Sequence, residues 1–209
     1  MKKLEVLNNY AGCGGNRKHW ENVEVTAVEW DQKTADVYQE LFPDDTVIVA
    51  DAHQYLIDHY KEFDFIWSSP PCPTHSNVNN FLNAQGVIRY PDMALYQEII
   101  FLKHFFKEGK YCVENVVSYY DPLIKPQLLH RHYFWANFLI TPLRVNAKGI
   151  SVTNSRGSTR RTTAEHLKSL QEHHGFPTVT DIKMLSNCVY PPLGQHIMKC
   201  AMGKTQQTL

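Results

Sequence analysis

Short apolar runs alternate with stretches of helical periodicity up to residue 140, and this alternation restricts the fold more than any other feature of the chain. It predicts strands at 4–7, 23–28, 46–49, 63–67 and 111–113, and helices at 32–41, 53–60 and 92–107. Strands separated by helices build a mostly parallel, doubly wound α/β sheet with helices on both faces. Two further apolar runs, 133–135 and 138–140, predict a terminal antiparallel hairpin. In such a sheet, ligands bind beyond the carboxyl ends of the strands.

Composition limits the class of protein. A length of 209 residues with 43% hydrophobic and 20% charged residues fits one soluble globular domain. The formal net charge is zero, so any nucleic-acid binding must rest on a local basic patch. The first residues are too polar for a signal peptide, and no apolar run reaches the ~20 residues of a membrane helix. The five cysteines are widely spaced and form no C-x-x-C pair, which predicts a reducing cytoplasm and no disulfide framework. The histidines have no cysteine or carboxylate at ligand spacing, so we expect no metal site.

A glycine-rich turn, Tyr10-Ala11-Gly12-Cys13-Gly14-Gly15, follows the first predicted strand. Glycine lets the backbone turn tightly and come close to a ligand. The G-x-G-G spacing differs from the G-x-G-x-x-G of dinucleotide-binding folds, which argues against a dinucleotide-dependent oxidoreductase. Taken alone, the turn is also compatible with an ordinary strand-to-helix connection.

Two acidic residues follow the next two predicted strands. Glu29 ends the second strand and can accept hydrogen bonds from both hydroxyls of a ribose, while the neighbouring Trp30 can pack against an adenine face. Asp51 follows the third strand and can accept from an exocyclic amine. The glycine turn and the two acids together predict an adenosine pocket. The alternative is a turn flanked by solvated acids.

The fourth predicted strand leads into Pro70-Pro71-Cys72-Pro73, and the fifth leads into Glu114. Prolines fix the backbone, so the thiol of Cys72 is held rigidly at a strand end. A thiolate that adds to carbon 6 of a pyrimidine turns carbon 5 into a nucleophile, and a carboxyl group can hold N3 and the 4-amino group of cytosine. The alternatives are a structural cysteine in a turn and a glutamate in an ion pair. Cys112 precedes Glu114, and we expect it to point into the core.

These residues resemble the DNA cytosine-5 methyltransferase family, and the resemblance runs in family order along nearly the whole chain. The first motif carries Tyr10 where the family usually has Phe. The matching segments are Tyr10 to Gly15, Glu29, Asp51, Pro71-Cys72-Pro73-Thr74-His75-Ser76 (P-C-x-x-x-S), Glu114-Asn115-Val116 (E-N-V), and Gln127-Leu128-Leu129-His130-Arg131 (Q-x-R-x-R, with Leu129 for the first Arg). The family's ninth motif is matched by Arg161, Glu165, Leu170 and Gly175-Phe176-Pro177. Its tenth motif resembles Asn187-Cys188-Val189-Tyr190-Pro191-Pro192.

The resemblance implies a Rossmann-like, S-adenosylmethionine-dependent methyltransferase that flips cytosine out of DNA and methylates carbon 5. Cys72 would form the covalent adduct, with Glu114 and Arg131 holding the base. Segment 73–90 is expected to be a mobile loop that closes over the base, with Ser76 near a phosphate. The residues implied to bind the cofactor are Tyr10, Gly12, Cys13, Gly14, Gly15, Glu29, Trp30, Asp51, Ala52, Pro70, Asn187 and Val189.

Family members usually carry a large target-recognition domain between the eighth and ninth motifs, and this chain has no room for one. We predict a catalytic and cofactor-binding core at 1–140, a short basic loop at 141–162, and a helical segment at 163–209 that completes the cofactor pocket. The loop would neutralise DNA phosphates without reading bases, which predicts weak or very short sequence specificity unless a partner protein supplies recognition. Its basic residues are Arg144, Lys148, Arg156, Arg160 and Arg161.

Two other functions stay open on the sequence alone. One branch of the same family modifies transfer RNA, so an RNA cytosine-5 methyltransferase is an alternative. A catalytically silent module that binds nucleic acid or S-adenosylmethionine is another, although Cys72 and Glu114 argue against it. The small size resembles compact, phage-type enzymes that act in the host cytoplasm.

Overall fold

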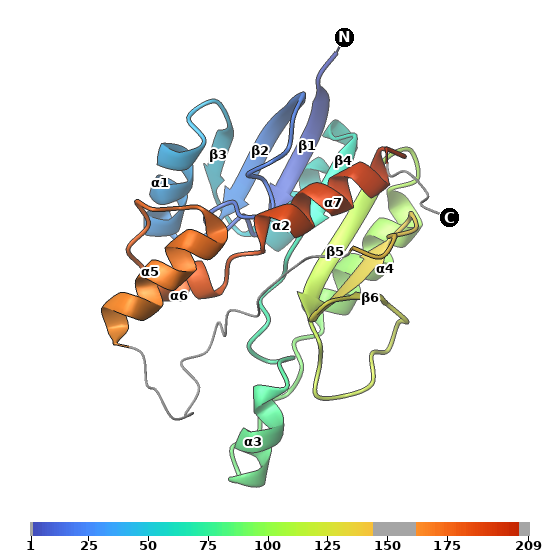
Figure 1. Cartoon of the computed structure of the whole chain (residues 1–209). Coiled ribbons are helices and arrows are strands. Elements are labelled where there is room, and N and C mark those ends of the chain that lie inside the picture. Colours follow the sequence, from blue (N-terminus) through green and yellow to red (C-terminus); the bar gives the residue numbers. More distant parts are fainter. Residues whose placement is uncertain (1, 144–161, 205–209) are drawn as a thin grey trace.

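The computed structural model describes residues 2–143 and 162–204, which form a seven-stranded sheet with helices on both faces (Figure 1). The strand order is β3-β2-β1-β4-β5-β7-β6. Strands β1 to β5 pair in parallel, whereas β7 is antiparallel to both β5 and β6. The strands are β1 Leu4–Asn9, β2 Val23–Glu29, β3 Thr46–Val49, β4 Phe65–Ser68, β5 Lys110–Val116, β6 Gln127–Leu129 and β7 His132–Ala136.

The helices cover the two faces of the sheet. On one face α7 packs against Val6, Phe65 and Trp67, and on the other α2 and α4 pack against Leu7 and Ile66. The central strands are therefore buried on both faces, as expected of parallel strands. The helices are α1 Gln32–Leu41, α2 Ala52–His59, the 3-10 turn η1 Tyr60–Glu62, α3 Val78–Ala84, α4 Ala94–Phe105, α5 Thr163–His174, α6 Ile182–Ser186 and α7 Pro191–Ala201.

The strand order places a topological switch point between β1 and β4. From β1 the chain first builds β2 and β3 on one side, and it then returns to build β4 and β5 on the other. At such a point the connections leave the sheet in opposite directions and open a crevice at the carboxyl ends of the strands. The glycine-rich turn after β1 and the proline-rich turn after β4 both begin here.

Two details of the sequence-based prediction were wrong. Residues 138–140 are not a strand, because the hairpin pairs β7 with β6. The side chain of Gln127 explains this, since its Nε2 donates to the Phe138 carbonyl and its Oε1 accepts from the Ile140 N–H, both at 2.8 Å. Segment 73–90, expected to be a loop, contains α3, which projects beyond the strand ends (Figure 1).

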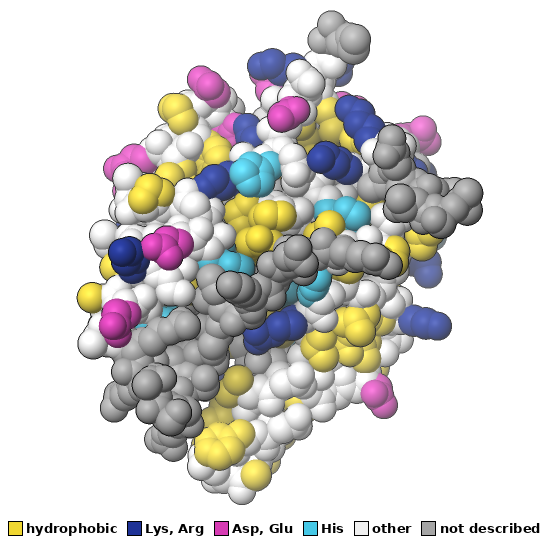
Figure 2. Space-filling view, viewed as in Figure 1, with side chains coloured by type: hydrophobic (Ala, Val, Ile, Leu, Met, Phe, Trp, Pro, Cys, Tyr) yellow, Lys and Arg dark blue, Asp and Glu magenta, His cyan; other side chains and the backbone are white. Residues whose placement is uncertain are grey.

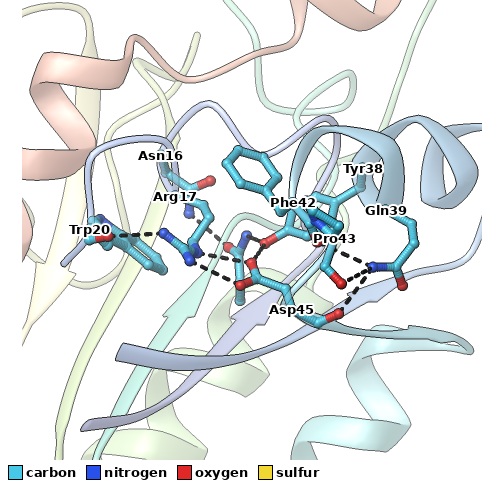
Figure 3. A network of polar contacts seen from close by, with 9 residues as sticks. Asn16, Arg17, Trp20, Tyr38, Gln39, Phe42, Pro43 and Asp45 are labelled. Carbon is cyan, nitrogen blue, oxygen red and sulfur yellow. Dashed lines mark hydrogen bonds and ion pairs between the residues drawn. The ribbon is translucent and has the colours of Figure 1, made fainter. Parts of the chain in front are cut away.

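A polar network fixes the segment that follows the glycine-rich turn (Figure 3). Arg17 donates two hydrogen bonds to Asp45, at 2.8 and 2.9 Å, and a third to the Trp20 carbonyl at 3.0 Å. Tyr38 donates to the same carboxylate at 2.8 Å. Such two-pronged Arg–carboxylate pairs are geometrically specific, so the network holds α1 and the turn in one arrangement.

Helix α7 comes unusually close to this segment at Gly194. A Cβ atom added there would lie 2.3 Å from the Asn16 carbonyl oxygen and 2.4 Å from its Cα. The Trp20 indole also donates to the Gly194 carbonyl at 3.1 Å. Only glycine therefore lets α7 dock at this distance.

We predict that Gly194→Ala destabilises the protein by about 1–3 kcal/mol, because the methyl group overpacks against backbone that cannot move freely. Ordinary helix propensity has the opposite sign and would make alanine more stable by about 1 kcal/mol. Urea unfolding measures the difference. Gln195→Ala, at the next position of α7, serves as the control, and a Gly194→Ala protein as stable as the wild type would contradict the prediction.

Candidate active site

The glycine-rich turn takes the left-handed conformation at three positions. The φ angles are 56° at Tyr10, 54° at Gly12 and 76° at Gly14. A Cβ at Gly12 would meet nothing within 4 Å, so the space beside this residue is open. The buried Cys13 packs in a cluster with Leu170 and Phe176, which joins the turn to the carboxyl-terminal helices.

The carboxyl-terminal segment lies against the same turn. A Cβ at Gly15 would lie 2.2 Å from both the Cys188 sulfur and the Val189 carbonyl oxygen. Asn187, the C-cap residue of α6, directly precedes them in the sequence, and its side chain is exposed. The structure therefore brings Val189 to the glycine-rich turn, as the predicted cofactor pocket requires.

Glu29 holds the backbone around the turn. Its carboxylate accepts hydrogen bonds from the N–H groups of Gly12 and Trp30, both at 3.0 Å, and of Asp31 at 3.2 Å. A carboxylate has about four acceptor positions, so capacity remains for a ligand hydroxyl. The Trp30 side chain is 77% exposed next to it, which leaves its ring free to meet a flat ligand.

Asp51 is exposed and also begins α2. Its Oδ1 accepts from the Gln54 N–H at 3.0 Å, which is the ordinary role of an N-cap residue. The neighbouring Ala52 is buried, and its carbonyl accepts from the Asn9 amide at 2.9 Å. Glu29 and Asp51 thus lie at adjacent strand ends, as predicted, but each carries a local structural role that the sequence did not show.

The thiol of Cys72 and the carboxylate of Glu114 share one environment. Glu114 is 6% exposed, and its Oε2 accepts from the Ser69 hydroxyl at 2.9 Å. That hydroxyl in turn accepts from the Trp67 indole at 2.7 Å. Asn115 donates to the Pro70 carbonyl at 3.0 Å, so β5 holds the proline-rich turn from the adjacent strand.

Burial raises the pKa of Cys72, and the negative charge of Glu114 raises it further. At neutral pH the free protein therefore holds residue 72 mainly as the thiol. Loss of the charge on Glu114 would favour the nucleophilic thiolate.

His132, rather than Arg131, lies beside Glu114. The His132 Nε2 is 3.7 Å from the Glu114 Oε1, whereas Arg131 is exposed and makes no hydrogen bond or ion pair to Glu114 within the described part of the chain. In the β5–β7 register Glu114 faces Phe134 and Val116 faces His132, so the alternation of side chains directs His132 to the face of Glu114. The sequence-based analysis missed His132, because that register was not predicted.

His75 and Ser76 directly follow the proline-rich turn. His75 is buried, its Nδ1 is 2.6 Å from the Tyr120 hydroxyl, and burial lowers its pKa. The predicted phosphate contact Ser76 forms an isolated bridge with Ser118. Cys112 is fully buried in the core cluster with Phe134, as expected.

The predicted basic contacts cannot be placed in the same way. Arg144, Lys148, Arg156, Arg160 and Arg161 lie outside the described residues. The division into segments 1–140, 141–162 and 163–209 therefore stays a prediction. Within the described ranges, His, Cys, Asp and Glu side chains form no group of three or more suited to a metal ion. In the same ranges no helix has the length and apolarity to cross a bilayer.

Comparison with known protein families decides between the interpretations of this site. Residues 4–93 match the family model of C-5 cytosine-specific DNA methylases. This segment contains the glycine-rich turn, Glu29, Asp51 and Cys72, and over these residues it confirms the resemblance seen in the sequence. The match supports a cytosine-5 methyltransferase. No curated protein matches the chain in sequence.

Solved structures support the fold. The methyltransferase EhMeth of Entamoeba histolytica matches with a TM-score of 0.60 and 13% identity, over 99% of this chain and 100% of that one. This likeness confirms the Rossmann-like fold. DNMT2 of Spodoptera frugiperda matches with a TM-score of 0.38 and 25% identity, over 54% of this chain and 34% of that one. The S-adenosylmethionine-dependent methyltransferase of Agrobacterium tumefaciens matches with a TM-score of 0.36 and 15% identity, over 55% of this chain and 39% of that one.

We predict that Cys72 becomes reactive only at alkaline pH and that Glu114→Gln lowers the midpoint, because removing a negative charge favours the thiolate. Iodoacetamide labelling between pH 6 and 10, read at residue 72 by mass spectrometry, measures the midpoint. Glu108→Gln, an exposed change of the same chemistry, is the control. Equal midpoints in the wild type and Glu114→Gln would show that the two groups do not interact.

Proposed function

We propose that this chain is a DNA cytosine-5 methyltransferase that uses Cys72 as its nucleophile and S-adenosylmethionine as its methyl donor. The observation that carries the proposal is that the turn bearing the half-buried Cys72 is held against the neighbouring strand, where Glu114 is buried. Hydrogen bonds from Ser69 to Glu114 and from Asn115 to the Pro70 carbonyl hold it there. An addition to a pyrimidine ring needs this combination of a rigid thiol and a proton donor or hydrogen-bonding group for N3.

The residues of the chain divide the reaction as follows. The Cys72 thiol loses its proton to solvent, and its sulfur donates an electron pair to carbon 6 of cytosine. The electrons of the carbon 5–carbon 6 double bond then move toward N3. Protonated Glu114 supplies a proton or a hydrogen bond there, so no isolated charge builds up on the ring. After carbon 5 has been methylated, its proton passes to water and its electrons re-form the carbon 5–carbon 6 double bond. The bond between sulfur and carbon 6 then breaks with its electron pair on sulfur and releases Cys72.

The residues at the other side of the crevice fit an adenosine-containing donor. The open space beside Gly12, the spare acceptor capacity of Glu29 and the exposed ring of Trp30 would hold it, with Asp51 and Val189 at the margins. When bound, S-adenosylmethionine supplies an electrophilic methyl group. Tyr10, Cys13, Gly14, Gly15, Ala52, Pro70 and Asn187 complete the proposed binding set.

The segment around α3 suits a nucleic-acid substrate. No acidic residue occurs between 65 and 91, so nothing in the segment repels phosphates. Phe81 is 65% exposed, Ile88 68% and Tyr90 82%, and the tip that carries α3 shows hydrophobic and uncharged side chains (Figure 2). Exposed aromatic rings next to a nucleophile are suited to stack on unpaired bases.

Covalent trapping tests the proposal. With a DNA duplex containing 5-fluorocytosine and S-adenosylmethionine, we expect a stable complex through Cys72, because fluorine at carbon 5 cannot leave as a proton. Gel mobility and peptide mass spectrometry identify the adduct. Cys72→Ala should abolish it, and turnover on ordinary DNA should fall on the order of a thousandfold or more. Trapping on RNA alone would replace DNA by RNA as the substrate, and no trapping on either would refute the proposal.

The same assay addresses sequence preference. A random-sequence duplex pool, sequenced after methylation, should show modification in many short contexts. The short segment 141–162, which we propose stands in place of a recognition domain, offers few side chains that can reach base edges. One strict site of four or more base pairs would point to base readout by other parts of the chain or to a partner protein.

We predict that Phe81→Ala combined with Tyr90→Ala weakens binding to single-stranded DNA by roughly thirtyfold or more, because each of two stacked bases contributes about 1–3 kcal/mol. S-adenosylhomocysteine binding should stay unchanged, since both residues belong to the segment around α3 and not to the glycine-rich turn. Fluorescence anisotropy with a labelled oligonucleotide measures the affinity. Phe105→Ala, which removes an aromatic ring on α4 that is 56% exposed, is the control. If Phe105→Ala weakened DNA binding and the double variant did not, the DNA would bind near α4 and not near α3.

A further inference from the structure

Glu98 is an unexpected residue in the middle of α4. It is 0% exposed, and its neighbours on the helix include the buried Leu95, Ile99 and Leu102. A carboxylate in such surroundings is strongly disfavoured unless several donors satisfy it. The proposed mechanism does not use it, so its presence needs another explanation.

Three side chains from three different elements donate to this carboxylate. The Tyr10 hydroxyl donates to Oε1 at 2.5 Å, and the His53 Nδ1 lies 2.9 Å from the same oxygen. The Ser68 hydroxyl donates to Oε2 at 2.6 Å. Tyr10 follows β1 and Ser68 ends β4, so the carboxylate connects the two strands that flank the switch point.

The two consecutive serines before the proline-rich turn are held from opposite sides. Ser68 bonds to Glu98 on the face covered by α4, and Ser69 bonds to Glu114 on the other face. Hydrogen bonds to a carboxylate are shorter and about twice as strong as those between neutral groups. The end of β4, four residues before Cys72, is therefore fixed by two buried acids.

Burial and the neighbouring carboxylates favour the protonated forms of Tyr10 and His53, which donate to Glu98. Burial and Glu98 raise the pKa of Tyr10 well above its usual value, so the phenol keeps its proton. The hydrogen bond to Glu98 raises the pKa of His53 despite partial burial, and Asp51 and Asp92 add to this effect. A protonated His53 supplies a positive charge opposite the buried carboxylate.

We propose that Glu98 is a positioning residue that fixes the methyl-donor turn and the nucleophile strand relative to each other, through Tyr10 on one side and Ser68 on the other. This inference rests on the proposed function, since it assumes a donor at the glycine-rich turn and a reacting thiol at residue 72. It also explains why this chain carries a tyrosine at position 10, because a phenylalanine would remove one of the three donors to Glu98.

Separate measurements on the two sides test this role. The first is the Kd of S-adenosylhomocysteine by calorimetry without nucleic acid, and the second is the rate of adduct formation on 5-fluorocytosine DNA at saturating donor. Tyr10→Phe should weaken donor binding on the order of tenfold, the effect of losing one hydrogen bond to a charged group, and Ser68→Ala should slow the adduct by a similar factor. Each change should leave the other quantity nearly constant, whereas Glu98→Gln should change both.

Non-additivity separates positioning from general loss of stability. With Glu98→Gln already present, Tyr10→Phe should weaken donor binding less than it does in the wild type, because the two groups act through one hydrogen bond. Glu108→Gln should match the wild type in both assays, and Tm is recorded for every variant. If Glu98→Gln fails to fold, the two single variants still decide, since each leaves Glu98 two of its donors.

Two results would overturn the inference in different ways. Equal changes of both quantities in Tyr10→Phe and Ser68→Ala, in proportion to their loss of Tm, would reduce Glu98 to a structural role while the proposed function stands. A wild-type protein that binds no S-adenosylhomocysteine and forms no adduct would remove the proposed function, and this inference with it.

Discussion

Hydrogen bonding of two buried carboxylates at the switch point is the constraint on which the rest of the structure depends. Glu98 and Glu114 approach the end of β4 from opposite faces, and each is tied to a serine there. Buried charges are tolerated only where their donors are in place, so every element that supplies a donor is held at a defined distance. The turn after β1, the end of β4 and helix α2 are thereby fixed relative to α4.

The sequence predicted the layers well, because parallel strands buried on both faces appear as continuous apolar runs. Helix 32–41 and strand 46–49 were predicted with their observed bounds. The predicted strand at 133–135 lies within β7, but the predicted strand at 138–140 does not form. The side chain of Gln127 makes the hydrogen bonds to the backbone at 138 and 140 that a partner strand would otherwise make. Contacts between a side chain and distant backbone leave no periodic pattern in a sequence, so no local rule could have found them.

The candidate site shows the same division between local and long-range information. Placing Cys72 and Glu114 at neighbouring strand ends follows from motif order and parallel topology, and both could be inferred. His132 could not, because its position beside Glu114 depends on the antiparallel register of β7. Glu98 was hidden for another reason. Leu95, Ile99 and Leu102 follow the helical period, and a single acid among them is invisible until its three distant donors are known.

The raised pKa of Cys72 is compatible with nucleophilic catalysis when the role of Glu114 is considered. In the free protein the negative carboxylate disfavours a second negative charge on the thiol, and each unit of pKa corresponds to about 1.4 kcal/mol. A cytosine that shares a proton with Glu114 removes this repulsion at the moment when the thiolate is needed. The half-buried Ser69 and the nearby His132 hold the carboxylate in place. In the proposed reaction, the same electrostatic contact that disfavours the thiolate in the free protein would therefore link the activation of Cys72 to binding of the base.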